Sequence, residues 1–421
     1  MSPSARSRYT LLIPTYNRPA YLRSLLGYLA ARRFEYPICV LDSSFEQALS
    51  ENRETIRGVA LDISYQVYDP AIHVTDKFAL GAQSVDTPYC SFCADDDVLF
   101  TDHLDELLDF LDANPAFVVA HGYYVGFKPG ADFDLSCTEY SAPSIAGDDG
   151  LKRIVEQVGN YQAIFYGIHR TGTMKSILTP LSRVKSFWAQ EMLTSSLTLI
   201  AGGAYRMPKY FLARNTGPSI ATEGWHPYQF FAIDPAELFR EYTVYRTVTL
   251  EHLAADARCQ ATYRPDQMRR IFDLVYLKYL APMISPAVMD YFIAQSMRPD
   301  AAPRQIIDGV WKMLAPPSDG GAGGLRRYLT RAARLTPGGA SKVVQYLRRF
   351  AGIYAELKFR AKFDVSVSPL LDRMTVKRTV RDGQSRRYNL SYALLRQDFA
   401  DGAHVTASHL RTIISHLDDY L

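Results

Sequence analysis

Short apolar runs alternate with helical periodicity over roughly the first 120 residues of the chain. Leu22, Leu25, Leu26 and Leu29 recur at i, i+3, i+4 and i+7, which predicts a helix. The same pattern predicts further helices at Lys77–Val85 and Leu104–Leu111. The expected strands are Tyr9–Ile13, Ile38–Leu41, Leu61–Tyr68, Tyr89–Cys93 and Phe117–Ala120. This alternation is typical of βαβ units and predicts an α/β fold built on a parallel sheet.

The pattern changes twice further along the chain. Glycine, proline and aspartate mixed with aromatic residues over 122–150 predict an irregular segment. Helices are expected at Leu151–Gln157 and Phe187–Ile200, the second ending at Gly202-Gly203. From about Pro235 onward the sequence reads as mainly helical, with no strand-like alternation. We therefore expect one domain over residues 1–235 and a helical C-terminal domain over 236–421.

Three consecutive aspartates, Asp95, Asp96 and Asp97, directly follow an apolar strand. Adjacent carboxylates repel one another, and a hard divalent cation with oxygen ligands would compensate their charge. Open α/β sheets bind ligands at the carboxyl ends of their strands. Asp42 ends the second predicted strand and is therefore expected at the same edge. The alternative is that the three aspartates only cap and solvate the turn into a helix starting near Thr101.

The net charge of the chain conceals a strong asymmetry. The 421 residues are 48% hydrophobic and 22% charged, with a net charge of +3, and the length favours two or three domains. Residues 325–387 hold 16 basic and 4 acidic residues, a net +12, so the remainder of the chain carries −9. This basic segment fits a surface helix on an anionic membrane, a nucleic-acid site, or a solvated face balanced by the acidic N-terminal domain. We favour the last interpretation and expect no nucleic-acid partner, since no nucleic-acid motif is present.

The cysteines and the N-terminal sequence indicate the cellular compartment of the protein. The five cysteines are an odd number scattered along the chain, which does not suit a disulfide framework and favours a reducing compartment. The N-terminus has no apolar signal region, and no run of about 18 apolar residues occurs. The expectation is a cytoplasmic protein, with peripheral contact at the inner face of a membrane and a homo-oligomer both left open.

Four motifs occur in the order of a known family. They are Leu12-Ile13-Pro14-Thr15-Tyr16-Asn17-Arg18, Val40-Leu41-Asp42-Ser43-Ser44, Phe92-Cys93-Ala94-Asp95-Asp96-Asp97 and Trp188-Ala189-Gln190-Glu191-Met192. Over residues 8 to 215 the chain resembles the family 2 glycosyltransferases of the GT-A fold. The resemblance implies a Rossmann-like, mostly parallel sheet flanked by helices, followed here by a mainly helical C-terminal domain. It also implies inverting transfer of a sugar from a UDP- or GDP-type donor to a hydroxyl of a glycan or lipid-linked acceptor.

The resemblance also implies a donor site at the strand ends. The residues expected to bind the nucleotide sugar are Pro14, Thr15, Tyr16, Arg18, Asp42, Lys77, Asp95 and Asp96. Asp95 and Asp97 are expected to bind Mg²⁺ or Mn²⁺. Lys77 has an equally good interpretation as a solvated lysine on a helix.

Glu191 is the catalytic base that the resemblance implies. The family usually carries a Glu-Asp pair at this helix, and here the pair reads Gln190-Glu191, so an amide replaces one acid. The alternative is that Glu191 is an ordinary surface acid. Acceptor contacts are expected from Glu223, Trp225 and His226 in the turn-rich segment.

Two other function classes stay open. A sugar-phosphate nucleotidyltransferase uses a similar sheet and carboxylate-bound Mg²⁺, but it should carry a glycine-rich phosphate loop after the first strand. This chain has Pro14-Thr15-Tyr16-Asn17-Arg18 there. A non-catalytic nucleotide-sugar-binding protein of the same fold would keep Asp42 and tolerate the loss of Glu191.

Overall fold

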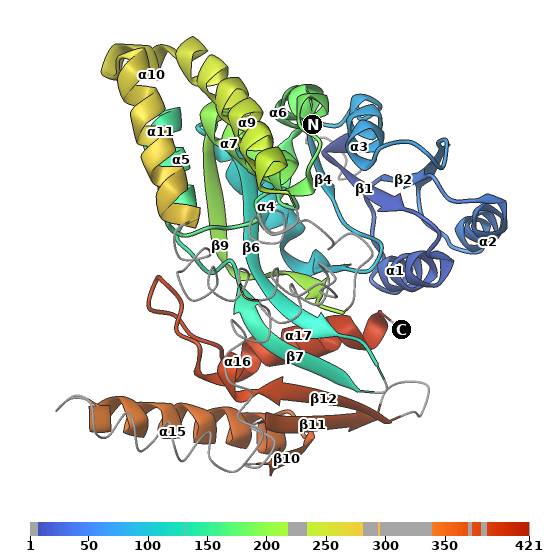
Figure 1. Cartoon of the computed structure of the whole chain (residues 1–421). Helices are drawn as coiled ribbons and strands as arrows, with labels where there is room; N and C mark the ends of the chain where they lie inside the picture. The colour runs from blue at the N-terminus through green and yellow to red at the C-terminus, as the bar shows by residue number, and fades with distance from the viewer. Residues whose placement is uncertain are drawn as a thin grey trace.

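The structure, a computed structural model, describes residues 7–130, 132–217, 234–280, 294, 339–368, 373–379 and 385–420. The described residues form one twelve-stranded sheet with helices on both faces (Figure 1). The predicted α/β fold is therefore confirmed. Among these residues, no helix is long and apolar enough to cross a membrane.

The N-terminal strands form a parallel block in the order β3-β2-β1-β4. Its strands are β1 (Tyr9–Thr15), β2 (Ile38–Asp42), β3 (Ile63–Val67) and β4 (Tyr89–Phe92). Thr15 at the end of β1 pairs with Asp42 at the end of β2, and Leu12 of β1 pairs with Phe92 at the end of β4. Because all four strands run the same way, their carboxyl ends lie at one edge, as predicted.

The sheet continues through strands that the sequence pattern only partly predicted. These strands are β5 (Val98–Leu99), β6 (Phe117–Lys128), β7 (Phe133–Glu139), β8 (Ile168–Arg170) and β9 (Gly203–Asn215). Figure 1 shows β6 and β9 side by side through the middle of the molecule, where they pair in parallel. The prediction of an irregular segment over 122–150 is wrong for the second half of β6 and for β7, and β9 was not predicted.

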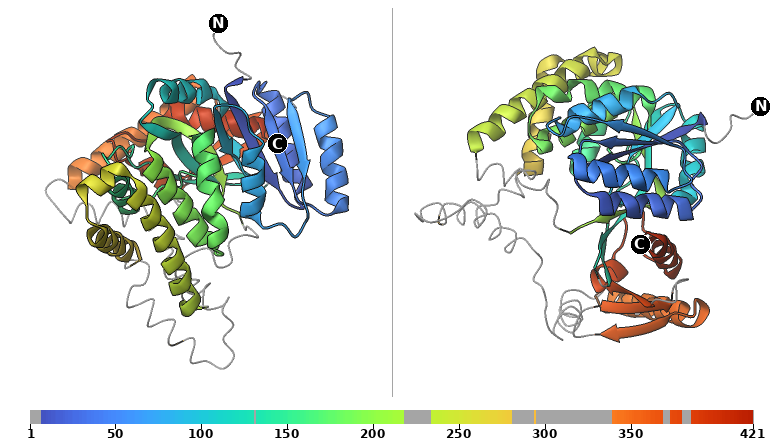
Figure 2. Two further views of the ribbon diagram at one scale, coloured as in Figure 1. Left: turned by 90° about the horizontal axis from the view of Figure 1, so that it is seen from above. Right: turned by 90° about the vertical axis from the view of Figure 1, so that its right-hand side faces the viewer.

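Three strands of the C-terminal region extend the same sheet. They are β10 (Asp364–Ser368), β11 (Arg373–Thr379) and β12 (Ser385–Ser391). β12 pairs in parallel with β7, so the C-terminal strands lie at the opposite end of the sheet from β3 (Figure 2). The expectation of no strands after Pro235 is wrong here, although the region is also helical. Its helices are α9 (Pro235–Ala255), α10 (Ala257–Thr262), α11 (Pro265–Leu280), α15 (Gly339–Ala355), α16 (Tyr392–Arg396) and α17 (Ala407–Asp419). The division into two domains at residue 235 stays a prediction.

Two apolar cores fill the space between the sheet and the helices. The N-terminal helices are α1 (Pro19–Ala31), α2 (Glu46–Arg57), α3 (Val74–Gln83), α4 (Leu104–Ala113), α5 (Gly150–Gly159), α6 (Thr171–Leu178) and α7 (Phe187–Ala201). One core includes buried residues of α1, α4 and α17, and the other includes residues of α5, α6, α7, α9 and α11. The C-terminal helix α17 therefore belongs to the same core as the first helix of the chain.

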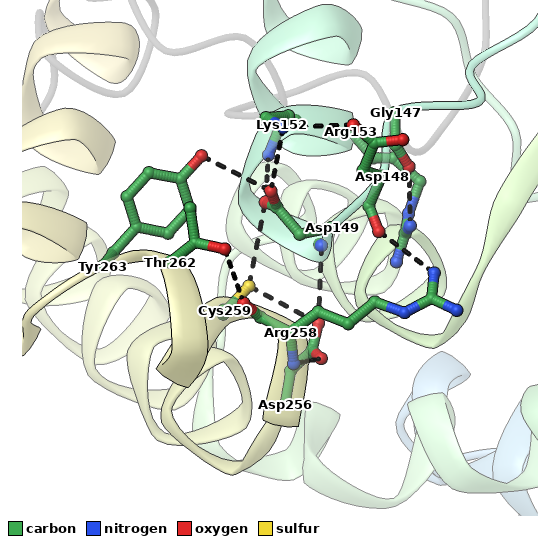
Figure 3. A network of polar contacts seen from close by, with 11 residues as sticks. Gly147, Asp148, Asp149, Lys152, Arg153, Asp256, Arg258, Cys259, Thr262 and Tyr263 are labelled. Carbon is green, nitrogen blue, oxygen red and sulfur yellow. Dashed lines mark hydrogen bonds and ion pairs between the residues drawn. The ribbon is translucent and has the colours of Figure 1, made fainter.

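Helix starts on the α5–α10 side are fixed by two aspartates (Figure 3). Asp149 accepts a hydrogen bond from the Lys152 backbone N–H and caps α5, and Asp256 accepts one from the Arg258 N–H and caps α10. Asp256 also accepts from the Gly150 N–H, so it joins the two helix starts. We call Asp149, Asp256 and their partners the capping network. Because each carboxylate lies at a helix N-terminus, its charge is favoured there.

Some of the basic residues of the 325–387 segment form ion pairs with acids in the described residues. Arg349 contacts Asp398 at 2.8 Å, and Arg378 contacts Asp418 at 2.5 Å. Residues 325–338 lie outside the described residues. Both of these acids belong to the C-terminal region itself, whereas Arg387 contacts Asp132 of the N-terminal half at 2.8 Å. Balance of the segment by the acidic N-terminal domain stays a prediction, and so does membrane contact.

Candidate functional site

The aspartate loop, Asp95 to Asp97, follows β4 directly at the edge where the parallel strands end. Asp95 is 0% exposed and Asp97 is 5% exposed, so two of the three carboxylates are buried. Burial of a charged group is costly unless hydrogen bonds or opposite charges compensate it. The partners of these two side chains therefore decide what the loop can do.

Arg18, the residue before α1, provides the main positive charge. Its guanidinium contacts Asp95 at 2.5 Å and Asp96 at 2.9 Å, using two different nitrogens. The Thr15 hydroxyl donates a hydrogen bond to the other oxygen of Asp95 at 2.7 Å. Predicted donor-site residues from β1 and from the aspartate loop thus lie in direct contact.

Asp97 has weaker support from the protein. The Asn215 backbone N–H, at the end of β9, donates to its Oδ1 at 2.9 Å. The pKa of Asp97 is raised to about 7, mainly by burial and then by the neighbouring charge of Asp96, while Asn215 and Arg214 oppose the shift. Burial likewise raises the pKa of Asp95 to about 7, against the opposing effect of Arg18. Both groups would gain from an additional cation.

A divalent cation fits this loop in one particular way. Among the described residues, no three His, Cys, Asp or Glu side chains come close enough to hold a metal ion by themselves. Mg²⁺ commonly binds through one or two carboxylates and completes its shell with substrate phosphates and water. The two buried carboxylates suit an ion of that kind, which arrives with a phosphorylated ligand. Asp97 is the better candidate because Asp95 is already paired with Arg18.

Lys77 on α3 reaches the same edge and is buried. Its ammonium donates hydrogen bonds to the Thr15 carbonyl at 3.0 Å and to the Ser43 hydroxyl at 2.9 Å. Burial lowers the pKa of Lys77 to about 8, and the charges of Asp42 and Asp95 partly oppose this. A close approach of α3 to β2 places the lysine here, since a Cβ on Gly81 would lie 2.3 Å from the Leu41 side chain. The interpretation of a solvated lysine is wrong.

Asp42 has an internal role in this structure. It is 0% exposed, and it accepts hydrogen bonds from the Ser44 backbone N–H, the Asn52 amide and the Tyr65 hydroxyl, at 2.7–2.8 Å. These three donors hold the loop after β2 in shape. Direct contact of this carboxylate with a nucleoside stays a prediction.

The loops after β1 and β2 bring two exposed aromatic rings together. Asn17 has a positive φ of 54° and its backbone N–H donates to the Ser44 hydroxyl, while its side chain accepts from the Phe45 N–H. This exchange ties the two loops to each other. Tyr16 and Phe45 are 39% and 59% exposed, with ring centroids 6.1 Å apart. Two exposed rings at the edge of a polar site provide a surface on which a planar base can stack.

Glu191 lies on α7, where Ser186 caps the helix. The Tyr161 hydroxyl donates a hydrogen bond to Glu191 Oε1. The charge of Glu191 raises the pKa of Tyr140 and Tyr166, after the larger effect of burial on each. Glu191 therefore faces a group of tyrosines and is not an isolated surface acid.

The same tyrosines connect Glu191 with the aspartate loop. The pKa of Tyr166 is raised by burial and then by the charge of Asp97, with Glu191 contributing less. Arg214 donates to the Tyr140 hydroxyl at 2.9 Å and contacts Glu139 at 3.5 Å. The candidate base and the candidate metal ligand thus both lie close enough to Tyr166 for their charges to raise its pKa.

Several site residues were not predicted, and others lie outside the described residues. Phe45, Tyr166, Arg214 and Asn215 were missed, and only Arg214 and Asn215 carried a signal, since they begin the turn-rich segment. Pro14, a predicted donor-site residue, pairs with Leu41 between β1 and β2 and is partly buried. The predicted acceptor residues Glu223, Trp225 and His226 lie outside the described residues.

Comparisons with known proteins find structural similarity but no sequence match. No protein-family model and no curated protein matches the sequence. S. aureus TarS matches with 14% identity and a TM-score of 0.46, over 90% of this chain and 60% of that chain. TarS 1–349 in complex with UDP-GlcNAc matches with 11% identity and a TM-score of 0.45, over 90% and 99% of the two chains. The mannosyltransferase PcManGT from Pyrobaculum calidifontis, in complex with GDP-Man and Mn²⁺, matches with 12% identity and a TM-score of 0.38, over 74% and 88%. At these TM-scores and identities, the likenesses decide nothing about the function of this chain.

Proposed function

We propose that the protein is a metal-dependent, inverting glycosyltransferase. It transfers a sugar from a nucleoside diphosphate sugar of the UDP or GDP type to a hydroxyl of a glycan or lipid-linked acceptor. The observation that carries the proposal is the aspartate loop: two buried carboxylates, each with a pKa raised to about 7, at the carboxyl ends of parallel strands. Ligands of open α/β sheets bind at this edge.

The donor site is assigned to the residues around this edge. The rings of Tyr16 and Phe45 receive the base, because they are exposed and adjacent. Arg18 and Lys77 provide positive charge beside the diphosphate, and Thr15 orients Asp95. Stacking of a base on an aromatic side chain contributes about 1–3 kcal/mol, so the two rings can account for much of the donor affinity.

Asp97 is assigned to the metal, with Asp95 beside it. A bound Mg²⁺ or Mn²⁺ ion would take up the negative charge that develops on the leaving nucleoside diphosphate. The Asn215 N–H keeps one oxygen of Asp97 in a fixed direction. Arg18 stays with Asp95 and Asp96, so its charge also faces the leaving group.

Glu191 is assigned as the base. An inverting transfer needs one group that accepts the proton of the acceptor hydroxyl as that oxygen attacks the sugar. The hydrogen bond from the Tyr161 hydroxyl fixes the direction of the Glu191 carboxylate. Gln190 does not duplicate this role, because it is 4% exposed and its side chain donates to the Val184 carbonyl.

The experiment has two stages, donor binding and transfer. A panel of UDP- and GDP-sugars, each with and without Mn²⁺, is screened for a rise in the melting temperature, since a ligand of the folded state stabilises it. Transfer from the best donor is then measured for the wild type and for Glu191→Gln. We expect Glu191→Gln to keep donor stabilisation and to lose transfer by roughly 10²–10⁴-fold.

The matched control is Glu251→Gln, which neutralises an exposed glutamate on α9 that pairs with Arg183. This variant should transfer as the wild type does. Donor stabilisation that is independent of Mn²⁺ would argue against the metal. If Glu191→Gln transferred the sugar as fast as the wild type, the assignment of Glu191 as the base would be wrong. If the wild type bound the donor without any transfer, a non-catalytic binding protein would be favoured.

A further inference from the structure

The C-terminal end of the sheet has one apolar face and one polar face. Met374, Val376, Tyr388 and Leu390 of β11 and β12 are buried in the core that includes α17. The alternate residues point to the other side, because successive side chains of a strand face opposite ways. We call this other side the polar face: Asp134 and Ser136 of β7, Arg387 and Asn389 of β12, Arg373, Thr375 and Lys377 of β11, and Asp364, Ser366 and Ser368 of β10.

A cavity of about 280 Å³ lies on the polar face. Its lining includes Ser366, Arg373, Thr375, Lys377, Arg387 and Asn389, and no apolar side chain from the described residues. A lining of hydroxyl, amide and charged groups does not suit an apolar ligand. It suits a ligand that offers many hydroxyl groups, each able to donate and accept.

Hydrogen bonds fix the middle of the lining. Asn389 is 6% exposed, and its amide donates to Asp134 at 2.8 Å across the β7–β12 pair. The Thr375 hydroxyl donates to the side-chain oxygen (Oδ1) of Asn389 at 2.9 Å across the β11–β12 pair. This ladder over three strands holds the polar groups in place before any ligand arrives, which reduces the entropy cost of binding.

Two like charges stand opposite each other at the same cavity. Lys377 pairs directly with Arg387 across β11 and β12, an arrangement that weakens a sheet. On the apolar side, Arg378 and Arg386 are also opposite each other, but Asp418 of α17 contacts the first side chain and its backbone carbonyl accepts from the second. At the cavity, Asp132 contacts Arg387 at 2.8 Å, and Asp364 of β10 is directly opposite Lys377 in the sheet. The ammonium of Lys377 and the guanidinium of Arg387 have more N–H donors than one carboxylate each can accept, and oxygen atoms of a ligand can accept from the others.

The polar face is continuous with the proposed active site. Gly126 of β6 pairs with Arg214 of β9, and a Cβ on Gly126 would lie 2.6 Å from the Ser136 hydroxyl of β7. Arg214 precedes Asn215, whose N–H contacts Asp97. From β9 the order of strands is β6, β7, β12 and β11, which at about 4.8 Å per strand places the cavity roughly 20 Å from Arg214.

We propose that the polar face binds the distal part of an extended, hydroxyl-rich glycan acceptor. The reactive end of this chain lies between Glu191 and Asp97, and its following units cross β6 and β7 to the cavity on β10–β12. This proposal rests on the proposed function for its reactive end. The binding of glycan at the cavity can be tested without it.

The test uses the full chain on an array of immobilised oligosaccharides. The array contains neutral chains and chains bearing carboxylate or phosphate groups, from single sugars to chains longer than about 20 Å. Ser366→Trp places an indole at the cavity, and Lys377→Glu reverses a charge there. We expect the wild type to retain long chains and not single sugars, and Ser366→Trp to weaken retention by roughly tenfold or more. Lys377→Glu should weaken the anionic chains most.

Ser64→Trp is the matched control. Ser64 is an exposed serine on β3, the edge strand at the opposite end of the sheet from β10. The Ser64→Trp variant should retain glycans as the wild type does. Ser366→Trp, Lys377→Glu and Ser64→Trp should all keep the thermal stabilisation by UDP or GDP. A wild type that retains no glycan, or a Ser366→Trp variant that retains glycans as the wild type does, overturns the proposal. Glycan retention without any nucleotide binding would keep the glycan site and overturn the proposed function instead.

Discussion

The capping network and the aspartate loop both hold buried carboxylates, and the protein stabilises them differently. In the capping network, Asp149 is 2% exposed and accepts the Lys152 N–H, while Asp256 accepts the N–H groups of Arg258 and Gly150 (Figure 3). In the aspartate loop, Asp97 is 5% exposed and accepts the backbone N–H of Asn215. The first region uses helix starts to stabilise its charges.

The second region lacks such support. The loop follows a strand, its carboxylates do not cap a helix of the described residues, and burial raises the pKa of both Asp95 and Asp97 to about 7. A fold that only needed these acids for stability would gain by replacing them with neutral side chains. The contrast indicates that the aspartate loop serves a ligand and that the capping network serves the fold.

The largest expected effect separates the two regions by activity. Asp97→Asn keeps the shape and an acceptor for the Asn215 N–H but removes the charge assigned to the metal. We expect transfer to fall by at least about 100-fold, and the metal-dependent stabilisation by the nucleotide to disappear. Above pH 7 and without ligand, the melting temperature of the variant should equal or exceed that of the wild type, because a buried charge of high pKa is lost. Activity and thermal unfolding are measured on the same preparation.

Asp149→Asn is the matched control, since it makes the same change at a carboxylate of similar burial. Asparagine is also a good N-cap, so activity and melting temperature should both stay near the wild type. If Asp97→Asn retained full activity, or if it unfolded at a clearly lower temperature, the aspartate loop would be structural as well and the comparison would fail.

The sequence predicted the aspartate loop because its signal is local. Apolar strands followed by polar residues at their carboxyl ends placed Asp42 and Asp95–Asp97 at one edge, and the parallel pairing of β1, β2 and β4 agrees. The burial of Lys77 was not predictable, since it depends on how closely α3 approaches β2 at Gly81. Phe45 was missed because its place beside Tyr16 depends on hydrogen bonds between two loops.

There are also physical reasons why some strands were not predicted. Gly122 and Gly126 suggested a loop, yet they lie within β6, where a Cβ on Gly122 would lie 2.2 Å from the Lys209 carbonyl of β9. The register of β6 and β9 shifts near Gly122, as expected for glycine at an irregular strand pair. β11 and β12 present few apolar positions and many basic ones, so their alternation was hidden by charge.

A smaller effect concerns the loss of stability in acid, which should come from buried histidines and not from the aspartate loop. His121 and His169 are both 0% exposed, and burial lowers the pKa of each to about 4. An unfolded histidine has a pKa near 6.5, so the unfolded state binds more protons between about pH 6.5 and 4, and stability is lost as the pH falls through this window. Each histidine contributes a slope of up to about 1.4 kcal/mol per pH unit.

His169→Gln should therefore make the acid loss of stability shallower between pH 6.5 and 4. The control is His252→Gln, an exposed histidine on α9. Unfolding in urea at several pH values gives the free energy of unfolding for each protein. An acid slope unchanged in His169→Gln and equal to that of the control would show that these buried histidines do not set the acid limit.

The smallest expected effect returns to the capping network, where it should be one of stability alone. Asp149→Ala removes the cap of α5 and the partner of the Lys152 N–H, which costs about 1 kcal/mol of the free energy of unfolding. Asp149→Asn should restore most of this, because the amide oxygen can accept the same hydrogen bond. Transfer per folded molecule should be the same in both variants, since α5 contributes no group to the donor site. A loss of donor affinity in Asp149→Ala at a temperature where it is fully folded would mean that the two regions are coupled, and the division between a ligand site and a structural network would have to be withdrawn.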